Sequence, residues 1–289
     1  MTRYLTRAIA GEVPTADEWD DHLIAFHRIY DDVTSSAISL FRTSGGETSY
    51  EFLARRVREL APEARDILDV GCGDGTLLAR IAHEYGNGVA LYGVDLSPDE
   101  IDRARSRLPA ASLRTLDAAK ADLGQKSYDA IVSHLTFLIM SRPADVLTRV
   151  RDALRPRGIL AFVTEDLSAQ GSVLQFAGSV LASLRTRLPT FAPAIPRREP
   201  IERDEVLGAL LDDVGLGDRT VERIELRASF SREQVWAFVE RTYALGLLEL
   251  SLRRELREHV DAMLGKISEK NATFSMILPL RLVAARARS

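Results

Sequence analysis

Three glycines at alternate positions follow a short apolar run that contains an aspartate. The stretch reads Ile67-Leu68-Asp69-Val70-Gly71-Cys72-Gly73-Asp74-Gly75-Thr76. The apolar run predicts a buried strand, and a turn without side chains lets a nucleoside cofactor lie directly against the backbone. In the dinucleotide fingerprint Gly-x-Gly-x-x-Gly the last position is glycine, whereas Thr76 stands there in this chain. The turn therefore indicates a nucleoside site and does not favour NAD.

A second carboxylate, Asp95, ends the apolar run 91–94, twenty positions after Gly75. A carboxylate at such a strand end can accept hydrogen bonds from both hydroxyls of a ribose. An aspartate at a strand end is also often only a helix cap, so Asp95 taken alone leaves both interpretations open. Together with the glycine turn upstream, it favours a bound nucleoside.

The elements that must position these residues alternate short apolar runs with amphipathic stretches. Strands are expected at 66–70, 89–94, 112–116, 128–133 and 158–163, with helices near 76–84, 98–107 and 143–154. Ser97 is expected to cap the second of these helices, and Pro98 suits its first position. Two later strands, 221–226 and 272–284, complete a doubly wound, mostly parallel seven-stranded sheet of the α/β class.

The flanking segments predict helices around this sheet. Residues 16–41 and 47–60 have helical spacing, and we expect residues 1–60 to form an N-terminal helical lid. The cofactor-binding core is expected at 61–166, and residues 167–289 are expected to supply cap helices and the completing strands. Helices are expected at 203–214 and within 232–264. The prolines that end the segment 167–200 predict an irregular arm over the active site.

The motifs occur in an order that resembles the class I S-adenosylmethionine-dependent methyltransferases. The similarity covers about residues 67–163 and rests on Asp69-x-Gly71-x-Gly73-x-Gly75, Val94-Asp95, Asp117-Ala118, the strand 128–133 and the turn 154–158. The family commonly has a second glycine before Gly158, where this chain has Arg157, in a turn remote from the cofactor. The resemblance implies a Rossmann-like methyltransferase fold, S-adenosyl-L-methionine as cofactor and S-adenosyl-L-homocysteine as product.

The resemblance also implies roles for individual residues. Asp69 would help to hold the methionine end of the cofactor over the glycine turn, Asp95 would bind the ribose, and Asp117 would meet the adenine amino group. The cofactor-binding residues expected on this basis are Asp69, Gly71, Cys72, Gly73, Asp95, Leu96, Asp117, Ala118 and Ser133. No Walker motif is present, in agreement with a cofactor that carries no phosphate.

His134 is the candidate general base, because it follows the fourth core strand at the edge where the site must open. A histidine that only lines the pocket or bonds to backbone is the alternative. The candidates for substrate contact are His27, Tyr30, Tyr50, Phe137, Trp236 and Tyr243. For the histidine and the aromatic residues in this set, ordinary packing of helices onto the core is the competing interpretation.

Composition narrows the choice of partners. The chain has 289 residues, is 46% hydrophobic and carries a net charge of −4 without a basic stretch, so neither nucleic acid nor a membrane surface is an expected partner. Cys72 is the only cysteine, and the five histidines show no metal-ligand spacing. We expect a cytoplasmic protein without a metal site, as a monomer or a homodimer.

These observations predict the methyl donor and do not identify the molecule that accepts the methyl group. We expect a methyltransferase that moves a methyl group from S-adenosyl-L-methionine to an N or O nucleophile of a small molecule, of the kind made in natural-product or antibiotic biosynthesis. One alternative is methylation of an activated carbon beside a ketone, with His134 removing the proton. Another is a protein of this fold that uses the cofactor without transferring its methyl group, for example in a rearrangement or cyclisation.

Overall fold

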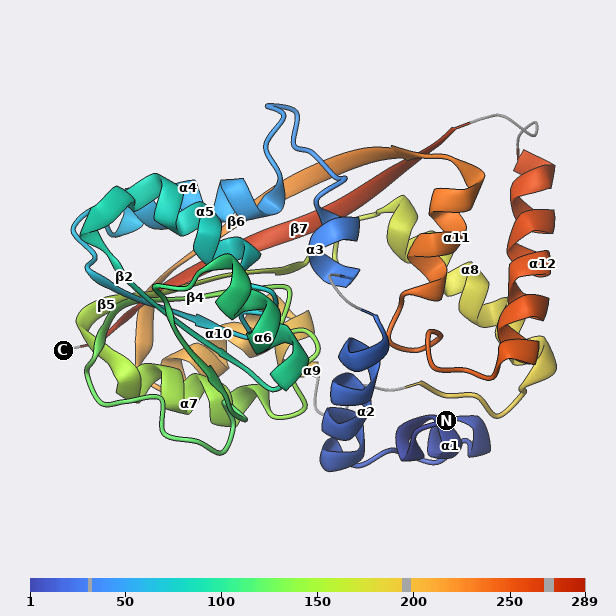
Figure 1. The fold of residues 1–289 in the computed structure, drawn as a ribbon, viewed down its shortest axis with the longest axis horizontal. Coiled ribbons are helices and arrows are strands. Elements are labelled where there is room, and N and C mark those ends of the chain that lie inside the picture. The colour runs from blue at the N-terminus through green and yellow to red at the C-terminus, as the bar shows by residue number, and fades with distance from the viewer. Residues whose placement is uncertain (31–32, 194–198, 268–272, 289) are drawn as a thin grey trace.

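The computed structural model describes residues 1–30, 33–193, 199–267 and 273–288. Its sheet is built from β1 (Asp66–Val70), β2 (Ala90–Asp95), β3 (Ser112–Thr115), β4 (Tyr128–His134), β5 (Leu154–Glu165), β6 (Leu216–Phe230) and β7 (Phe274–Ala287). The strand order is β3-β2-β1-β4-β5-β7-β6. The first five strands are parallel, and β7 runs antiparallel to both β5 and β6. The predicted seven-stranded, mostly parallel sheet is confirmed (Figure 1).

Helices cover both faces of the sheet because side chains alternate along each strand. Ile67 of β1 packs in one buried cluster with Leu53 of α4 (Ser49–Leu60) and with Leu77 of α5 (Thr76–Tyr85). Its neighbour Leu68 packs in another cluster, which contains side chains of α7 (Pro143–Ala153) and α10 (Asp204–Asp213). Ile67 and Leu68 are fully buried, and such burial contributes about 1.5–3 kcal/mol per side chain.

The turns after β1 and β2 are fixed by local backbone contacts. The N–H groups of Gly71 and Cys72 donate to the carbonyl oxygen of Val94 at 2.8 and 3.0 Å, which holds the glycine turn against the end of β2. Ser97 then caps α6 (Pro98–Arg107), as the sequence predicted, by accepting the Glu100 N–H at 3.3 Å. A 3-10 turn, η1 (Gly86–Gly88), leads from α5 into β2. The carboxyl ends of β1 and β2 therefore lie side by side.

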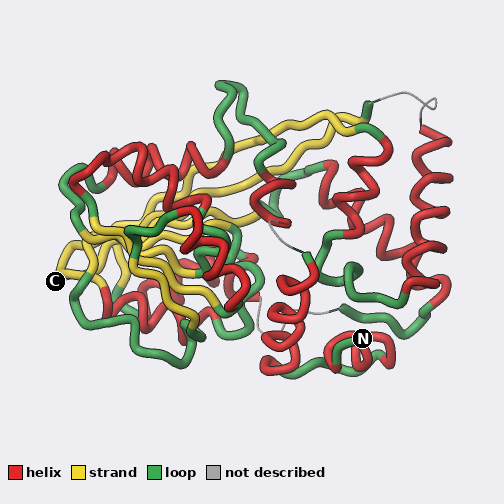
Figure 2. Tube along the Cα trace, viewed as in Figure 1, coloured by secondary structure: helices red, strands yellow, loops and turns green. Residues whose placement is uncertain are grey.

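The remaining helices form a second, largely helical part of the molecule. We call α1 (Arg3–Ala10), α2 (Ala16–Ile29), α8 (Ser172–Arg187), α11 (Arg232–Glu240) and α12 (Leu250–Ile267) the helical cap. In Figure 1 these helices gather beyond one end of the sheet, and the long strands β6 and β7 extend toward them. Figure 2 shows the same separation between a strand-rich half and a helical half. The short helices α3 (Val33–Ile38) and α9 (Glu199–Glu202) lie in connecting segments.

The structure corrects several sequence expectations for this second part. The segment 167–200 contains the helix α8, which ends before the proline-rich stretch and packs against β7 and α12. No described residue of that segment lines the cavity described below, so the expectation of an irregular arm over the site was wrong for the residues that the structure describes. The segment 16–41 divides into α2 and α3, with residues 31–32 outside the described part. Residue 272, expected to begin the last strand, also lies outside it.

Two further features of the helices have local causes. Helix α1 was not expected, although Thr2 caps its start and Gly11 ends it with a φ of +76°. The helical region 232–264 is broken between α11 and α12. Gly246 lies in this break, where an added Cβ would come within 2.7 Å of the Phe26 ring and 2.9 Å of the Tyr30 ring. The close approach of α2 therefore requires a glycine and a turn at this point.

Candidate functional site

A cavity opens at the carboxyl edge of β1, β2 and β4, between the sheet and α2. Its empty space is about 1100 Å³, including the part open to solvent. Nine of the lining residues were predicted from the glycine turn and its neighbours or from the edge of β4: Asp69, Gly71, Cys72, Gly73, Asp95, Leu96, Asp117, Ala118 and His134. His27, Tyr50 and Tyr243 also line it.

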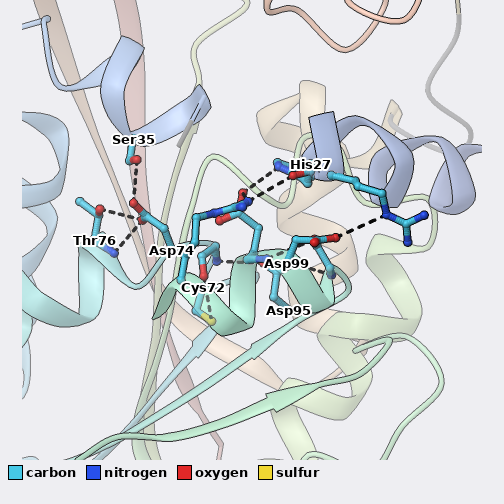
Figure 3. Close-up of polar contacts among 12 residues, drawn as sticks. His27, Ser35, Cys72, Asp74, Thr76, Asp95 and Asp99 are labelled. Carbon is cyan, nitrogen blue, oxygen red and sulfur yellow. Dashed lines mark hydrogen bonds and ion pairs between the residues drawn. The ribbon is translucent and has the colours of Figure 1, made fainter. Parts of the chain in front are cut away.

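Asp95 is held between the glycine turn and the start of α6. Its Oδ2 accepts the Gly73 N–H at 2.9 Å and its Oδ1 accepts the Ser97 N–H at 2.9 Å (Figure 3). Burial raises the pKa of the Asp95 carboxyl, although these two backbone hydrogen bonds act in the opposite direction. A carboxylate has about four acceptor sites, so both oxygens retain capacity for further donors from the cavity.

Asp69 is the most isolated carboxylate of the site. It is 1% exposed, and its Oδ1 has no hydrogen-bond partner among the described residues. Burial, followed by the neighbouring charges of Asp95 and Asp74, raises the pKa of Asp69 well above its ordinary value. A buried carboxylate is stabilised by a cationic partner. The site therefore contains an unsatisfied acceptor suited to an ammonium group.

The glycine turn has one tight side and one open side. A Cβ at Gly71, whose φ is +74°, would lie 2.2 Å from Cγ2 of Thr136. A Cβ at Gly73 would meet only Oε2 of Glu100, at 3.8 Å. The turn thus packs against the segment after β4 at Gly71, while the backbone at Gly73 faces open space where a ligand can lie against it.

Asp117 marks another end of the cavity. Its Oδ1 accepts the Ala119 N–H at 2.9 Å, and its Oδ2 is 3.1 Å from Nζ of Lys120. The start of α2 reaches this end, because Asp17 lies 3.2 Å from the same lysine and 2.6 Å from the guanidinium of Arg142. Charged contacts therefore hold the cap helix α2 against the core beside Asp117.

His134 occupies a buried position at the end of β4. Its Nε2 is 2.8 Å from Oγ of Ser49, and its ring stacks on Tyr50 with 3.8 Å between the ring centroids. Burial lowers the pKa of His134 to about 3. An effective general base has a pKa near the operating pH, so this environment favours a neutral, hydrogen-bonding histidine. Its assignment as the base stays a prediction.

Four of the predicted site residues lie beside the cavity and do not line it. Ser133 donates to the carbonyl oxygen of Val70 at 2.8 Å and ties β4 to the end of β1. Phe137 is buried against Phe162. The Tyr30 hydroxyl donates to the carbonyl oxygen of Gly246 at 2.9 Å. Trp236 is 7% exposed and packs within the cap cluster. These positions match the packing alternative for the aromatic residues.

The lining residues that the sequence analysis missed include two carboxylates near the glycine turn, Asp74 and Glu100. Oδ1 of Asp74 accepts the N–H of Thr76 at 3.1 Å, and its Oδ2 accepts the Ser35 hydroxyl at 2.9 Å (Figure 3). Its place inside the glycine turn was a usable signal. Ser97-x-x-Glu100 has the pattern of a helix capping box, but the Glu100 carboxylate contacts His27 of the cap instead. Sequence offers no sign of that contact.

The comparison with protein families decides the identity of the core. Residues 68–160 match the family model described as a methyltransferase domain. The core is a class I S-adenosylmethionine-dependent methyltransferase domain. This match covers the glycine turn and the three predicted cofactor-binding carboxylates Asp69, Asp95 and Asp117. It leaves the helical cap outside.

Individual relatives of this methyltransferase domain resemble parts of the chain. It is 42% identical over 81 residues to the dTDP-3-amino-3,4,6-trideoxy-alpha-D-glucopyranose N,N-dimethyltransferase of Streptomyces venezuelae, covering 28% of this chain and 32% of that one. It is 33% identical over 101 residues to the malonyl-[acyl-carrier protein] O-methyltransferase of Acetivibrio thermocellus, covering 34% and 35%. The chain thus spans about a third of the length of these curated relatives.

A solved structure of similar fold covers nearly the whole chain. The [4+2]-cyclase SpnF superposes with a TM-score of 0.57 over 96% of this chain and 98% of its own, at 16% sequence identity. A similarity at this identity establishes the fold alone. It shows that the arrangement of core and cap helices occurs in another protein.

Two further properties concern the residues that the structure describes. No helix there is both long and apolar enough to cross a membrane. Among the same residues, no group of three or more histidine, cysteine, aspartate and glutamate side chains is arranged to hold a metal ion.

Proposed function

We propose that this protein transfers a methyl group from S-adenosyl-L-methionine to a nitrogen or oxygen atom of a small molecule. The observation that carries the proposal is the buried carboxylate Asp69 and the partly buried carboxylate Asp95 on either side of an open glycine turn. Six carboxyl side chains and one arginine line the cavity. This excess of acidic groups suits a cofactor that carries both a sulfonium and an ammonium group.

The lining residues fit the parts of this cofactor. Asp69 is positioned to accept the methionine ammonium, because its Oδ1 has no partner among the described residues. Asp95 retains acceptor capacity for ribose hydroxyls, and Asp117 is a candidate to accept from the adenine amino group. When bound, the cofactor supplies an electrophilic methyl group. The protein then needs to exclude water and to hold the acceptor in line with that group.

The relatives support both nitrogen and oxygen as the acceptor atom. One is an N,N-dimethyltransferase of an amino sugar nucleotide and the other an O-methyltransferase of a carrier-bound acid. The acceptor would enter on the side of α2 and Tyr243, which close the cavity from the cap. A specialised metabolite is the proposed class of substrate, since the cap supplies a large surface beyond the cofactor site.

A second function shares the cofactor and omits methyl transfer. The fold similarity to a [4+2]-cyclase over nearly the whole chain is the observation that favours it. The two functions differ in one product, because only methyl transfer releases S-adenosyl-L-homocysteine at each turnover. Carbon methylation with His134 as base receives less support, since burial lowers the pKa of that histidine to about 3.

Ligand-dependent melting tests the cofactor. We expect S-adenosyl-L-homocysteine at about 100 times its Kd to stabilise the protein by about 2.7 kcal/mol, and adenine alone to have a much smaller effect. Asp95→Ala should abolish the shift, whereas Asp102→Ala, on the exposed side of α6 with 74% of its side chain accessible, should retain it. No shift with either cofactor form would refute the proposal.

The acceptor is then sought by release of S-adenosyl-L-homocysteine. We would incubate the protein and S-adenosyl-L-methionine with separate sets of amino sugars, alkylamines, phenols and enolisable ketones. Product release with the amines or phenols supports the proposed function, and release only with the ketones supports carbon methylation. Conversion of a polyene without release of S-adenosyl-L-homocysteine supports the cyclase alternative.

A further inference from the structure

Three polar side chains from distant parts of the chain meet at the cavity. His27 comes from α2, Glu100 from α6, and Tyr243 from the turn between α11 and α12. Nδ1 of His27 lies 2.8 Å from Oε1 of Glu100. Nε2 of the same ring lies 3.3 Å from the Tyr243 hydroxyl. The imidazole is thus placed between a carboxylate and a phenol, and all three residues line the cavity.

The charge on Glu100 gives this array a direction. The carboxyl is nearly buried, with 5% of its side chain exposed. Burial alone would raise the pKa of Glu100, but the contacts with His27 and Arg103 outweigh it and lower that pKa. A carboxylate beside Nδ1 favours a proton on that nitrogen, which leaves the Nε2 lone pair facing the Tyr243 hydroxyl. Carboxylate, imidazole and hydroxyl in this order form the arrangement that activates hydroxyl groups in other enzymes.

The neighbours of His27 place the array next to the cofactor residues. Figure 3 shows His27 on the cap helix, on the same side of the site as Asp95 and Asp99. The charged groups that face His27 are Glu100 and Arg103 of α6 and Asp95 at the end of β2, and the titratable Tyr243 faces it from the cap. The Arg103 guanidinium donates to the His27 carbonyl oxygen at 3.3 Å and holds α2 in place.

Two members of this array, Tyr243 and Glu100, also act electrostatically on Tyr50. Burial raises the pKa of the Tyr50 phenol, and the charges of Asp74, Asp69, Tyr243 and Glu100 raise it further. These groups therefore converge on one region of the cavity. His134 is less suited to accept a proton there, because burial lowers its pKa to about 3.

We propose that Glu100, His27 and Tyr243 form a proton relay that deprotonates the nitrogen or oxygen of the methyl acceptor, an inference that rests on the proposed function. The bond between the heteroatom and its hydrogen breaks, and its electron pair stays on the heteroatom. The proton passes to the Tyr243 oxygen while the tyrosine's own proton moves to Nε2 of His27. The resulting imidazolium is paired with the Glu100 carboxylate and loses its proton to solvent through the 14% of the His27 side chain that is exposed.

The first test needs no acceptor. In protein labelled with ¹⁵N-histidine and saturated with S-adenosyl-L-homocysteine, we expect ring nitrogen shifts of neutral His27 to report the form protonated at Nδ1. Glu100→Gln should shift the neutral ring toward a mixture of the two forms, and His27→Asn assigns the signals. A neutral His27 protonated at Nε2 in the unchanged protein would overturn the relay. So would a spectrum that Glu100→Gln leaves unaltered.

The second test measures turnover of alkylamines and 4-substituted phenols by release of S-adenosyl-L-homocysteine. We expect His27→Asn and Tyr243→Phe to lower kcat by about 100-fold or more for acceptors that are protonated at neutral pH. The loss should be much smaller for 4-nitrophenol at a pH above its own pKa, where it is already ionised. In His27→Asn the rising limb of the pH–rate profile should move to the higher pH at which the acceptor loses its proton without help from the protein. His83→Asn, at an exposed position, and Tyr92→Phe, on β2, are the matched controls.

Binding of S-adenosyl-L-homocysteine separates the failure of the relay from that of the proposed function. Unchanged kcat in both variants, or a raised KM with the same kcat and the same pH profile, would reduce the array to a structural contact and overturn the relay. Failure of the unaltered protein to bind S-adenosyl-L-homocysteine would instead remove the proposed function. If His27→Asn fails to fold, Glu100→Gln and Tyr243→Phe carry the same comparison.

Discussion

The two walls of the cavity are built in different ways. On the sheet side, Asp69, the glycine turn and Asp95 lie within 27 residues of sequence (69–95) and are fixed by backbone hydrogen bonds such as Gly71 to Val94. On the cap side, the contact between His27 and Tyr243 joins residues 216 positions apart. Trp19 reaches Ile139 across 120 positions, donating from Nε1 to its carbonyl oxygen at 2.6 Å. The sheet-side wall, where we propose that the cofactor binds, thus follows from local chain geometry. The cap-side wall, where we propose that the acceptor binds, depends on tertiary packing.

The largest effect expected from this difference concerns Phe26, which is fully buried in the cap. Its ring lies 4.7 Å from that of Tyr243 and 4.9 Å from that of Tyr30, measured between centroids. Phe26→Ala should lower the stability of the cap by about 3–5 kcal/mol. We expect amide hydrogen exchange to accelerate in α2, α11 and α12 while β1 and β4 remain protected.

Phe26→Leu is the control for this experiment, because it keeps most of the apolar volume and should cost less than about 1.5 kcal/mol. Exchange that rises equally in the sheet and in the cap would contradict the comparison. It would mean that the two walls unfold as one cooperative unit.

The glycine turn should show the opposite behaviour. Gly71→Ala places a Cβ 2.2 Å from Thr136 in a backbone with a φ of +74°. Overpacking and backbone strain together should cost about 2–4 kcal/mol, and denaturant unfolding should show the loss for the whole protein, since the turn joins β1 to α5. Gly86→Ala, with a φ of +65° but no atom within 4 Å of the added Cβ, should cost only the backbone part. Equal losses in the two variants would remove the role of Thr136.

The same division explains what could be predicted from the sequence. The core strands, the capping of α6 by Ser97 and the cavity position of Asp69, Asp95 and Asp117 depend on period, turn chemistry and strand ends, all of which are local. The pairing of Glu100 with His27 was not predictable, because a capping-box pattern explained the glutamate within its own helix. Tyr243 was a candidate from its residue type, but only the fold brings it to His27.

The missed helices teach a related point. Thr2 and Gly11 bracket α1 with ordinary start and stop signals, so this helix follows from local rules. For α8, Pro189 and Pro193 stand after the helix end. They describe the segment that follows the helix and give no information about residues 172–187.

Replacing Asp69 tests the sheet-side wall, because the change should raise the stability of the ligand-free protein and weaken cofactor binding. Because its pKa is raised in the folded protein, the contribution of Asp69 to the stability of the ligand-free protein is fully present below about pH 4, the unfolded pKa, and is lost as the pH rises through the higher folded pKa. Asp69→Asn should remove this dependence and stabilise the ligand-free protein at pH 7.

The same variant should bind S-adenosyl-L-methionine about 10- to 100-fold more weakly, since it loses a charge-assisted hydrogen bond worth about 1.5–3 kcal/mol. Melting between pH 4 and pH 8 and calorimetric titration measure the two effects, with the exposed Asp102→Asn as control. A variant that melts lower at pH 7, or that binds the cofactor unchanged, would show that Asp69 already has a cationic partner.

The smallest effects come from one capping device used on both walls. Thr48 caps α4 on the sheet side and Thr15 caps α2 in the cap, each through a capping box with the glutamate three residues on. Thr48 is buried and Thr15 is exposed. Thr48→Ala should therefore cost about 1–2 kcal/mol and Thr15→Ala about 0.5–1 kcal/mol, with Thr→Ser restoring both.

Global unfolding should report the Thr48 loss in full. Exchange of the α2 amides should report the Thr15 loss while the sheet amides stay unchanged, because the cap opens without the sheet. If Thr15→Ala lowers the protection of β1 as much as that of α2, the cap has no separate opening, and the long-range contacts of His27 are as firmly held as the glycine turn.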